Sequence, residues 1–214
     1  FSGVCNFEIG VKMSSRSTDI NENNEAQHYY NNAILNVCKV PNNNSAKINA
    51  SPLQIVYLNE LVKYNIEASD KDGDSMSYKL MKAKISIDKF IEYPSTMSDK
   101  KPLTVKPPGV IFDNKVGELS FTPFKLGESG VFVIEITEHR KINGVMQVVG
   151  VVRSDVQFYV ANSPGNSPPG LLNDEMDFEI CAGDEICIDF SATDVKTGQN
   201  YDTVNFTCFS EVKG

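Results

Sequence analysis

Apolar and polar residues alternate with a period of two through much of this chain, and this pattern constrains its fold most. Neighbouring side chains of a strand point to opposite faces, so each such segment predicts a half-buried β-strand. Turn dipeptides such as Asp72-Gly73 and Asn143-Gly144 separate the segments, and helical periodicity is scarce. We therefore predict an all-β protein of Ig-like or cadherin-like antiparallel β-sandwich domains. The segments are Phe7 to Met13, Val62 to Ala68, Met76 to Leu80, Phe132 to Ile136 and Val156 to Val160.

Two passages rich in Asn, Pro and Ser interrupt the alternation, at residues 41–52 and 162–170. Such composition is typical of linkers between domains. Similar sequences follow each passage, ending in Ala68-Ser69-Asp70 and Ala192-Thr193-Asp194, which indicates a tandem repeat. We predict that residues 1–44 complete a preceding β-domain, that 45–162 form a whole Ig-like unit, and that 163–214 begin the next.

The five cysteines lack the short spacings and neighbouring histidines that zinc sites require. Disulfides in an oxidising compartment therefore fit better than free thiols. We expect Cys5 and Cys38 in the N-terminal part, and Cys187 and Cys208 in the C-terminal part, to form disulfides, which leaves Cys181 over. The formal net charge of -8 offers no cluster of Lys and Arg for a phosphate backbone, so nucleic acid is not an expected partner.

Three carboxylates, those of Asp70, Asp72 and Asp74, surround Gly73 within five residues. Calcium takes oxygen ligands from such tight loops, so one interpretation is a calcium site. The spacing is not that of an EF-hand, however, and Asp and Gly favour turns without any metal. A plain turn between two strands is the other interpretation, and the sequence leaves both open.

Charged residues flank the expected Asn143-Gly144 turn, namely Glu138, Arg140, Arg153 and Asp155. They predict a hairpin held together by charge pairs, although two carboxylates in a cleft would also suit glycoside hydrolysis. The two histidines, His28 and His139, have no Ser or Cys motif placed to use them, and we expect both at the surface. Glycine-rich phosphate loops are absent from the sequence as well, so we expect no enzyme activity.

The ordered motifs of the middle unit resemble those of one protein family. That family is the repeat-built surface proteins of Bacteroidetes that often carry a gliding-motility-associated C-terminal domain. The motif residues are Ala68 to Leu80 with an Asp-x-Asp-Gly-Asp core, Asp113 to Pro123, Gly130 to Val133, Glu138 to Arg140, Asn143-Gly144, and Arg153 to Phe158. Val116 and His139 depart from the usual Thr and Tyr, and the third unit lacks the Asp-Gly-Asp turn.

The resemblance implies a non-catalytic segment of a large adhesin or filament protein, exported by the type IX system to the bacterial cell surface. Its partners would then be neighbouring repeats of the same polypeptide, the outer-membrane secretion machinery or surface glycans. The resemblance further implies O-glycosylation of Asp-Ser/Thr-apolar sites, with Ser75 and Thr203 as the candidates. Calcium at the acidic loop would be the one bound ion.

Two other functions are compatible with the sequence. A glycan-binding accessory module would stack sugars on aromatic side chains, but the chain has no Trp, and the adjacent Tyr29 and Tyr30 would face opposite ways on a strand. A passive stalk or cargo segment of the type IX system would have no ligand of its own. An aromatic-rimmed concave surface would favour the first, and rigid contacts between domains the second.

Overall fold

The computed structural model describes residues 5–14, 28–163, 169–171, 191–193 and 204–205. The described residues form strands and no helix, so the all-β prediction is confirmed. The chain divides into two compact units, one that runs to Asn162 and one that comprises Ser163–Ser210. No described helix is long and apolar enough to cross a membrane.

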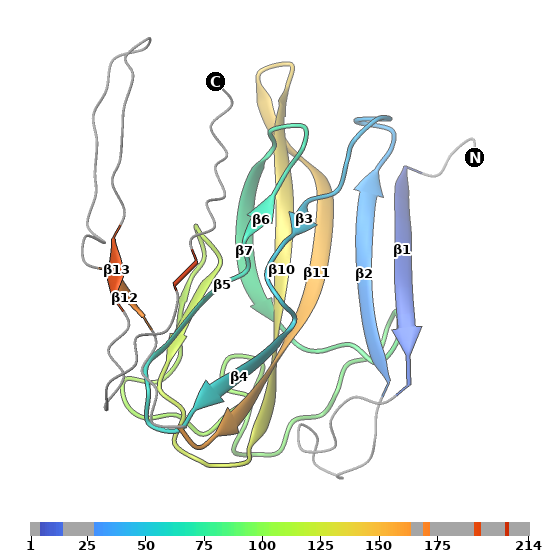
Figure 1. Cartoon of the computed structure of the whole chain (residues 1–214). Helices are drawn as coiled ribbons and strands as arrows, with labels where there is room; N and C mark the ends of the chain where they lie inside the picture. The colour runs from blue at the N-terminus through green and yellow to red at the C-terminus, as the bar shows by residue number, and fades with distance from the viewer. Residues whose placement is uncertain (1–4, 15–27, 164–168, 172–190, 194–203, 206–214) are drawn as a thin grey trace. The chain divides into compact units, whose positions relative to one another are not determined.

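The first unit is built on a six-stranded sheet in which β1, β2, β11, β10 and β7 follow one another and β4 also pairs with β11 (Figure 1). All neighbours are antiparallel except β4, which runs parallel to the last part of β11. These strands are β1 (Asn6–Met13), β2 (Tyr29–Asn36), β4 (Leu53–Tyr57), β7 (Ser75–Met81), β10 (Ser129–Ile142) and β11 (Val145–Ala161).

Shorter strands form a second layer and a separate two-stranded pair in the first unit, and another pair in the second unit. A three-stranded sheet has the order β5 (Val62–Asn65), β9 (Glu118–Phe121) and β8 (Ile111–Asp113), and β3 (Lys47–Ile48) pairs with β6 (Ala68–Ser69). In the second unit, β12 (Gly170–Leu171) pairs with β13 (Ala192–Thr193). The two layers of the first unit agree with a β-sandwich, whereas the tandem Ig-like arrangement stays a prediction.

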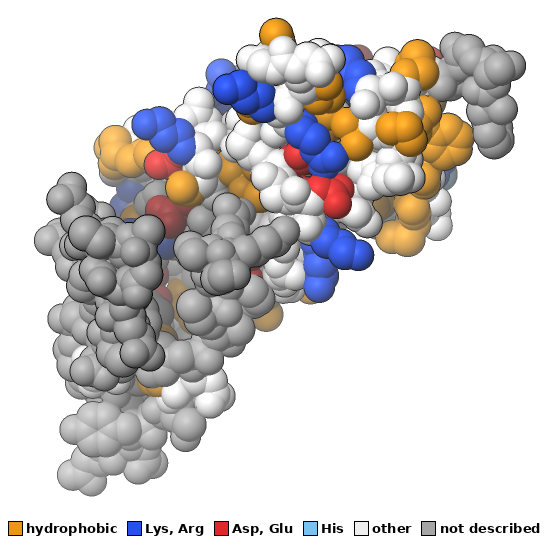
Figure 2. All heavy atoms as spheres, turned by 90° about the horizontal axis from the view of Figure 1, so that it is seen from above, with side chains coloured by type: hydrophobic (Ala, Val, Ile, Leu, Met, Phe, Trp, Pro, Cys, Tyr) orange, Lys and Arg blue, Asp and Glu red, His pale blue; other side chains and the backbone are white. Residues whose placement is uncertain are grey.

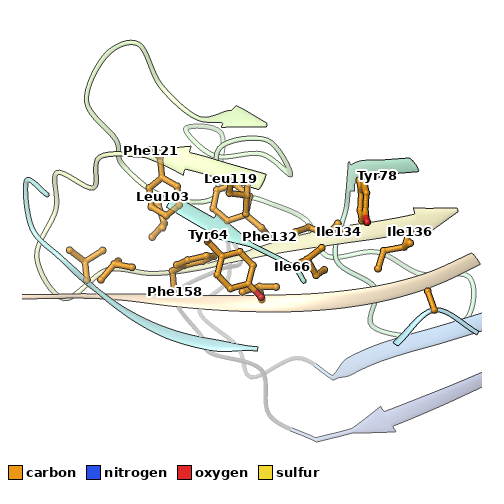
Figure 3. Packing of buried hydrophobic residues seen from close by; sticks show 14 residues of the cluster. Tyr64, Ile66, Tyr78, Leu103, Leu119, Phe121, Phe132, Ile134, Ile136 and Phe158 are labelled. Atoms are coloured by element: carbon orange, nitrogen blue, oxygen red, sulfur yellow. The ribbon is translucent and has the colours of Figure 1, made fainter. Parts of the chain in front are cut away.

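The core lies between the six-stranded and three-stranded sheets and contains the apolar residues that alternation predicts (Figure 3). Phe132, Ile134 and Ile136 of β10 are completely buried. Phe158 of β11 packs edge-on against Tyr64 and Phe121, with ring centroids 5.4 and 5.2 Å apart. Edge-to-face packing of this kind adds specific geometry to the burial of large aromatic area.

The other face of β10 is also covered, which its alternation does not predict. Val131 and Val133 are 2% exposed and pack with Ala83 and Ile91 from the long β7–β8 connection. A second, smaller apolar cluster therefore lies on the outer side of the sheet. For this reason β10 resembles a strand buried on both faces rather than a half-buried one.

The expectation of a half-buried strand is wrong for β1. Every residue of this strand is exposed, and the apolar row from Phe7 to Met13 is 42–57% exposed. β1 lies at the edge of the six-stranded sheet beyond β2, away from the three-stranded layer (Figure 1). Alternation thus identified the strand but not whether a second layer covers it.

The segment from residue 41 to 52, which the sequence predicts as a linker, is attached to the first unit. It contains β3 and several residues that hydrogen-bond to the sandwich. On its N-terminal side, β2 pairs with β11 from Gly150 to Val152, so residues before 44 continue the same sheet. The boundaries at 44 and 162 remain predictions about how the repeats are divided.

Cys5 and Cys38 form a disulfide that closes the open end of the β1–β2 pair. The bridge spans 33 residues, and closing a loop of that length contributes about 3–4 kcal/mol in the chain-entropy model. Its presence agrees with the expected pairing in the N-terminal part. Cys181, Cys187 and Cys208 lie outside the described residues.

Replacing Phe158 with Ala should lower the free energy of unfolding by about 3–5 kcal/mol, because a fully buried ring leaves a cavity between the sheets. Tyr159→Ala is the matched control, since the neighbouring side chain is 42% exposed, and should cost less than about 1 kcal/mol. Urea denaturation of both variants measures the difference. Equal losses would show that the core is not where the structure puts it.

Candidate functional site

The acidic loop between β6 and β7 is ordered by its own first residue. Asp70 Oδ1 accepts hydrogen bonds from the backbone N–H groups of Asp72 and Asp74, each at 2.9 Å. Gly73 has a φ of 78°, which a residue with a side chain adopts only with strain. One carboxylate oxygen each from Asp70, Asp72 and Asp74 lies within 4.8 Å of the others, so the structure brings the three predicted ligands together.

Arg140 of β10 is the partner that this loop faces. Its Nη2 lies 2.7 Å from Asp74 Oδ2 and 3.2 Å from Asp72 Oδ2, and its Nε also binds Asp74. The Asp74 side chain is only 2% exposed, so burial without a cation would be costly. This two-pronged contact with Asp74 raises the pKa of Arg140. A guanidinium of the protein itself thus supplies positive charge at the acidic loop.

Asn44 occupies the other side of Asp72. Its backbone N–H donates to Asp72 Oδ2 at 2.7 Å, and its side-chain Nδ2 donates to Oδ1 at 2.9 Å. These two bonds, together with Arg140, lower the pKa of Asp72. Both carboxylate oxygens of this residue therefore already have donors, and a metal ion would have to compete with them.

A fourth carboxylate, that of Glu138, lies fully buried next to this loop. Its Oε1 accepts from the Ala46 N–H at 2.7 Å, and its Oε2 accepts from Asn43 Nδ2 at 2.9 Å. Burial raises its pKa, and the nearby charges of Asp70 and Asp74 act in the same direction. The two hydrogen bonds oppose that shift but do not cancel it.

Asn43 joins the two charged groups into one network. Its Oδ1 accepts from Arg140 Nη2 at 2.7 Å while its Nδ2 donates to Glu138. The chain of contacts runs from the acidic loop through Arg140 and Asn43 to Glu138 and Ala46. We call these residues, with Asn44, the junction network: Asn43, Asn44, Ala46, Asp70, Asp72, Asp74, Glu138 and Arg140.

Local backbone geometry makes room for Glu138. It lies opposite Gly150 in the β10–β11 register, next to an irregularity that leaves Val149 as an extra residue. A Cβ atom at position 150 would overlap the Glu138 carboxylate. Gly150 therefore allows an acidic side chain to reach the interior between β10 and the segment that contains Asn43.

The charged hairpin was predicted correctly only in part. The turn itself is present, with Asn143 and Gly144 at φ of 50° and 84°. Arg153 does bind across it, with its Nε 2.6 Å from Glu135 Oε2, and its Nη1 also contacts Asn32. Glu138 and Arg140, however, bind residues outside the hairpin, because the loops before β3 and β7 meet β10 there.

Glu135 was missed by the sequence reasoning. Its side chain is 5% exposed and binds Lys79 at 2.7 Å as well as Arg153. Burial alone would raise its pKa, but the Lys79 hydrogen bond and the Arg153 charge outweigh burial, and the pKa is lowered. An acidic residue at an apolar position of β10 is the signal that could have found it.

The remaining predicted residues are not brought together. Tyr30 covers Gly10, bonds to Glu8 and lies 5.6 Å from Lys84 Nζ, whereas Tyr29 points to the opposite face with Asn31. His28 is exposed, and the half-buried His139 is 2.9 Å from Ser77 Oγ. Ser75 begins β7 and is exposed, while Thr203 lies outside the described residues.

One hollow of about 580 Å³ lies between the edges of β7 and β8. Tyr78, Leu80, Val110 and Phe112 provide apolar lining, and Lys79, Lys100 and Asn114 provide polar groups. Its described lining residues include no carboxylate pair of the kind that glycoside hydrolysis uses. On the face that Figure 2 shows, acidic side chains lie beside Lys and Arg side chains.

Comparison with protein-family models gives no match for this chain, and a search of curated proteins also gives none. The resemblance to the Bacteroidetes surface proteins therefore stays a prediction from the ordered motifs. The comparisons do not decide between the two interpretations of the acidic loop, a calcium site or a plain turn. The geometry adds that Asp70 Oδ2 is buried without a hydrogen-bond partner, whereas Asp72 and Asp74 already contact Arg140.

Replacing Arg140 with Gln should lower the free energy of unfolding by about 2–4 kcal/mol, because Asp74 stays buried after losing its charge partner. We expect millimolar calcium to leave the melting temperature of the wild-type chain unchanged and to restore part of the loss in Arg140→Gln. Lys141→Gln, at the exposed next position, is the control. A calcium-dependent rise for the wild type would instead support a native calcium site.

Replacing Gly150 with Ala should cost about 2–3 kcal/mol, since the new methyl group overlaps the Glu138 carboxylate. Glu138→Ala should also destabilise the fold, because the Ala46 N–H loses its acceptor. The double variant should lose less than the sum of the single losses, by about 1–2 kcal/mol. If chemical denaturation shows that the two single losses simply add in the double variant, then Gly150 has a role other than making room for Glu138.

Proposed function

We propose that this chain is a non-catalytic segment of a large secreted adhesin or filament protein at a bacterial cell surface. Its role is to space and present Ig-like units. The junction network carries the proposal, because it uses the charged motif residues to bind the predicted linker to the sandwich. Asn43, Asn44 and Ala46 each receive or donate a hydrogen bond there.

A spacer needs a fixed path for the chain through each of its units. Backbone groups of Asn44 and Ala46 are held by carboxylates of the sandwich, at 2.7 Å in both cases. Hydrogen bonds to charged groups contribute more than neutral ones, about 1.5–3 kcal/mol each. The predicted linker would therefore keep one direction as it passes from β2 to β4, which suits transmission of position along a row of repeats.

The chemistry of the site favours this role over catalysis. Arg140, Asp74 and Glu138 have partners within the fold and low exposure, so they offer little to a substrate. The disulfide between Cys5 and Cys38 supports passage through an oxidising compartment, as expected for export to the surface. The ordered motifs then supply the link to type IX-exported surface proteins.

A glycan-binding module is the second candidate, and one observation favours it. Lys84 Nζ lies 5.6 Å from the Tyr30 ring and 5.8 Å from the Phe90 ring, so two aromatic side chains share one region of the sheet. Phe90 is 43% exposed. A sugar could stack there, although Lys84 already covers both rings. A passive stalk or cargo segment is the third candidate.

A domain exchange in the source bacterium distinguishes these functions. Deleting residues 1–162, which belong to one compact unit, should reduce surface attachment, and an unrelated β-sandwich of similar length in their place should restore it if they act as a spacer. A glycan module predicts no rescue by the foreign domain and loss of attachment in Phe90→Ala. A passive segment predicts normal attachment after the deletion.

Surface location has its own check. Antibodies against the chain should label intact cells, and brief protease treatment of those cells should remove the label. Labelling only after permeabilisation would contradict the proposed location without deciding whether the segment is a spacer.

A further inference from the structure

β1 is eight residues long and lies at an edge of the six-stranded sheet. Among the described residues it pairs only with β2, and all eight of its residues are exposed. Figure 1 shows it as the outermost strand of the six-stranded sheet. Protective features of edge strands include short length, proline and charged side chains; this strand is not short, has no proline, and carries Glu8 and Lys12 as its charged residues.

An apolar row lies along this edge strand. Ile9, Val11 and Met13 are 57%, 55% and 56% exposed, on the face that continues the core side of the sheet. Scattered surface hydrophobic residues need no explanation, but a contiguous row on a long open edge favours pairing with another strand. The question is which strand fits.

The hydrogen bonds between β1 and β2 show which backbone N–H and C=O groups of β1 point away from β2. The Val37 N–H donates to the Cys5 carbonyl at 2.9 Å, in line with the β1–β2 register. In an antiparallel pair, alternate residues bond to the partner strand and the others point away. Odd-numbered residues of β1 therefore bond to β2, and Glu8, Gly10 and Lys12 direct their N–H and C=O groups outward.

The sequence of β1 is complementary to itself about Gly10. When two copies run antiparallel with Gly10 opposite Gly10, Glu8 of each copy faces Lys12 of the other. In the same register Ile9 faces Val11, and both are apolar. Glu8, Gly10 and Lys12 then form the hydrogen-bonded pairs of the new ladder. Backbone hydrogen bonding, charge pairing and apolar pairing therefore all favour this one register.

We propose that β1 pairs antiparallel with β1 of a second copy of this chain, about a two-fold axis at Gly10, and joins two six-stranded sheets into one. A one-residue slip would put the apolar row of one copy beside the polar row of the other. A two-residue slip would lose the two charge pairs. The isologous geometry closes on itself, so it gives a dimer rather than an open fibre.

Three intramolecular contacts prepare the edge for this register. Glu8 Oε1 accepts from Asn32 Nδ2 at 2.7 Å and from the Tyr30 hydroxyl at 3.2 Å, which fixes the carboxylate on its face of the strand. Tyr30 also lies against Gly10, where a Cβ atom would overlap the ring. The two-fold axis would therefore pass through Gly10, which has no side chain, with the oriented Glu8 carboxylate two residues away.

Sedimentation velocity of the oxidised 214-residue chain at about 0.15 M salt should show a monomer–dimer equilibrium that shifts with concentration. Lys12→Glu puts two acidic side chains opposite each other twice in each dimer and should raise the dissociation constant by about tenfold or more. Lys63→Glu, an equal charge change at an exposed residue of β5, should leave it unchanged. A chain that is monomeric at all concentrations overturns the proposal.

Mixing variants tests the register independently. Glu8→Lys and Lys12→Glu should each dimerise weakly alone, yet form a mixed dimer when combined, because every charge pair is then complementary. Circular dichroism checks that both variants keep the fold. A dimer that is insensitive to both substitutions would place the interface elsewhere and would overturn the proposal.

Cysteine cross-linking covers the case in which a charge variant does not fold. Ile9→Cys mixed with Val11→Cys should form an intermolecular disulfide faster than either variant alone, since the two positions face each other across the axis. The wild-type chain under the same oxidation gives the background from native thiols. Equal rates in the mixture and in the single variants would exclude this register.

Discussion

Burial of β10 on both faces is the constraint on which the rest of this fold depends. One face packs against the three-stranded sheet and the other against the long β7–β8 connection. A strand in this position must be apolar almost throughout, and any charge within it needs partners inside the protein. Glu135 and Glu138 meet that requirement in different ways, one with Lys79 and Arg153 and the other with Ala46 and Asn43.

The two glutamates show how a buried charge can organise distant parts of a chain. Glu138 attracts donors from a segment more than ninety residues earlier, because the desolvated carboxylate needs hydrogen bonds that its own strand cannot offer. Glu135 instead connects the strands on either side of β10, through Lys79 on β7 and Arg153 on β11. Glu138 therefore fixes the segment between β2 and β4, and Glu135 links the strands on either side of β10.

The sequence predicted which segments are strands much better than it predicted what covers them. Period-two alternation found β10 and β11 and the residues of their inner faces, and Asn143-Gly144 identified the turn between them. The same pattern gave no warning that β1 would be exposed, since alternation reports that a face is apolar and not that a second layer lies on it. Partners of Arg140 were also out of reach, because loops far apart in the sequence supply them.

The parallel pairing of β4 with β11 gives the first unit a mechanical property. β4 lies near the start of residues 45–162, and β11 ends them, with Leu53 to Tyr57 aligned beside Gln157 to Ala161. A pull between the two ends of this region would act along both strands in opposite directions. The hydrogen bonds of the ladder would then share the load in shear instead of opening one after another.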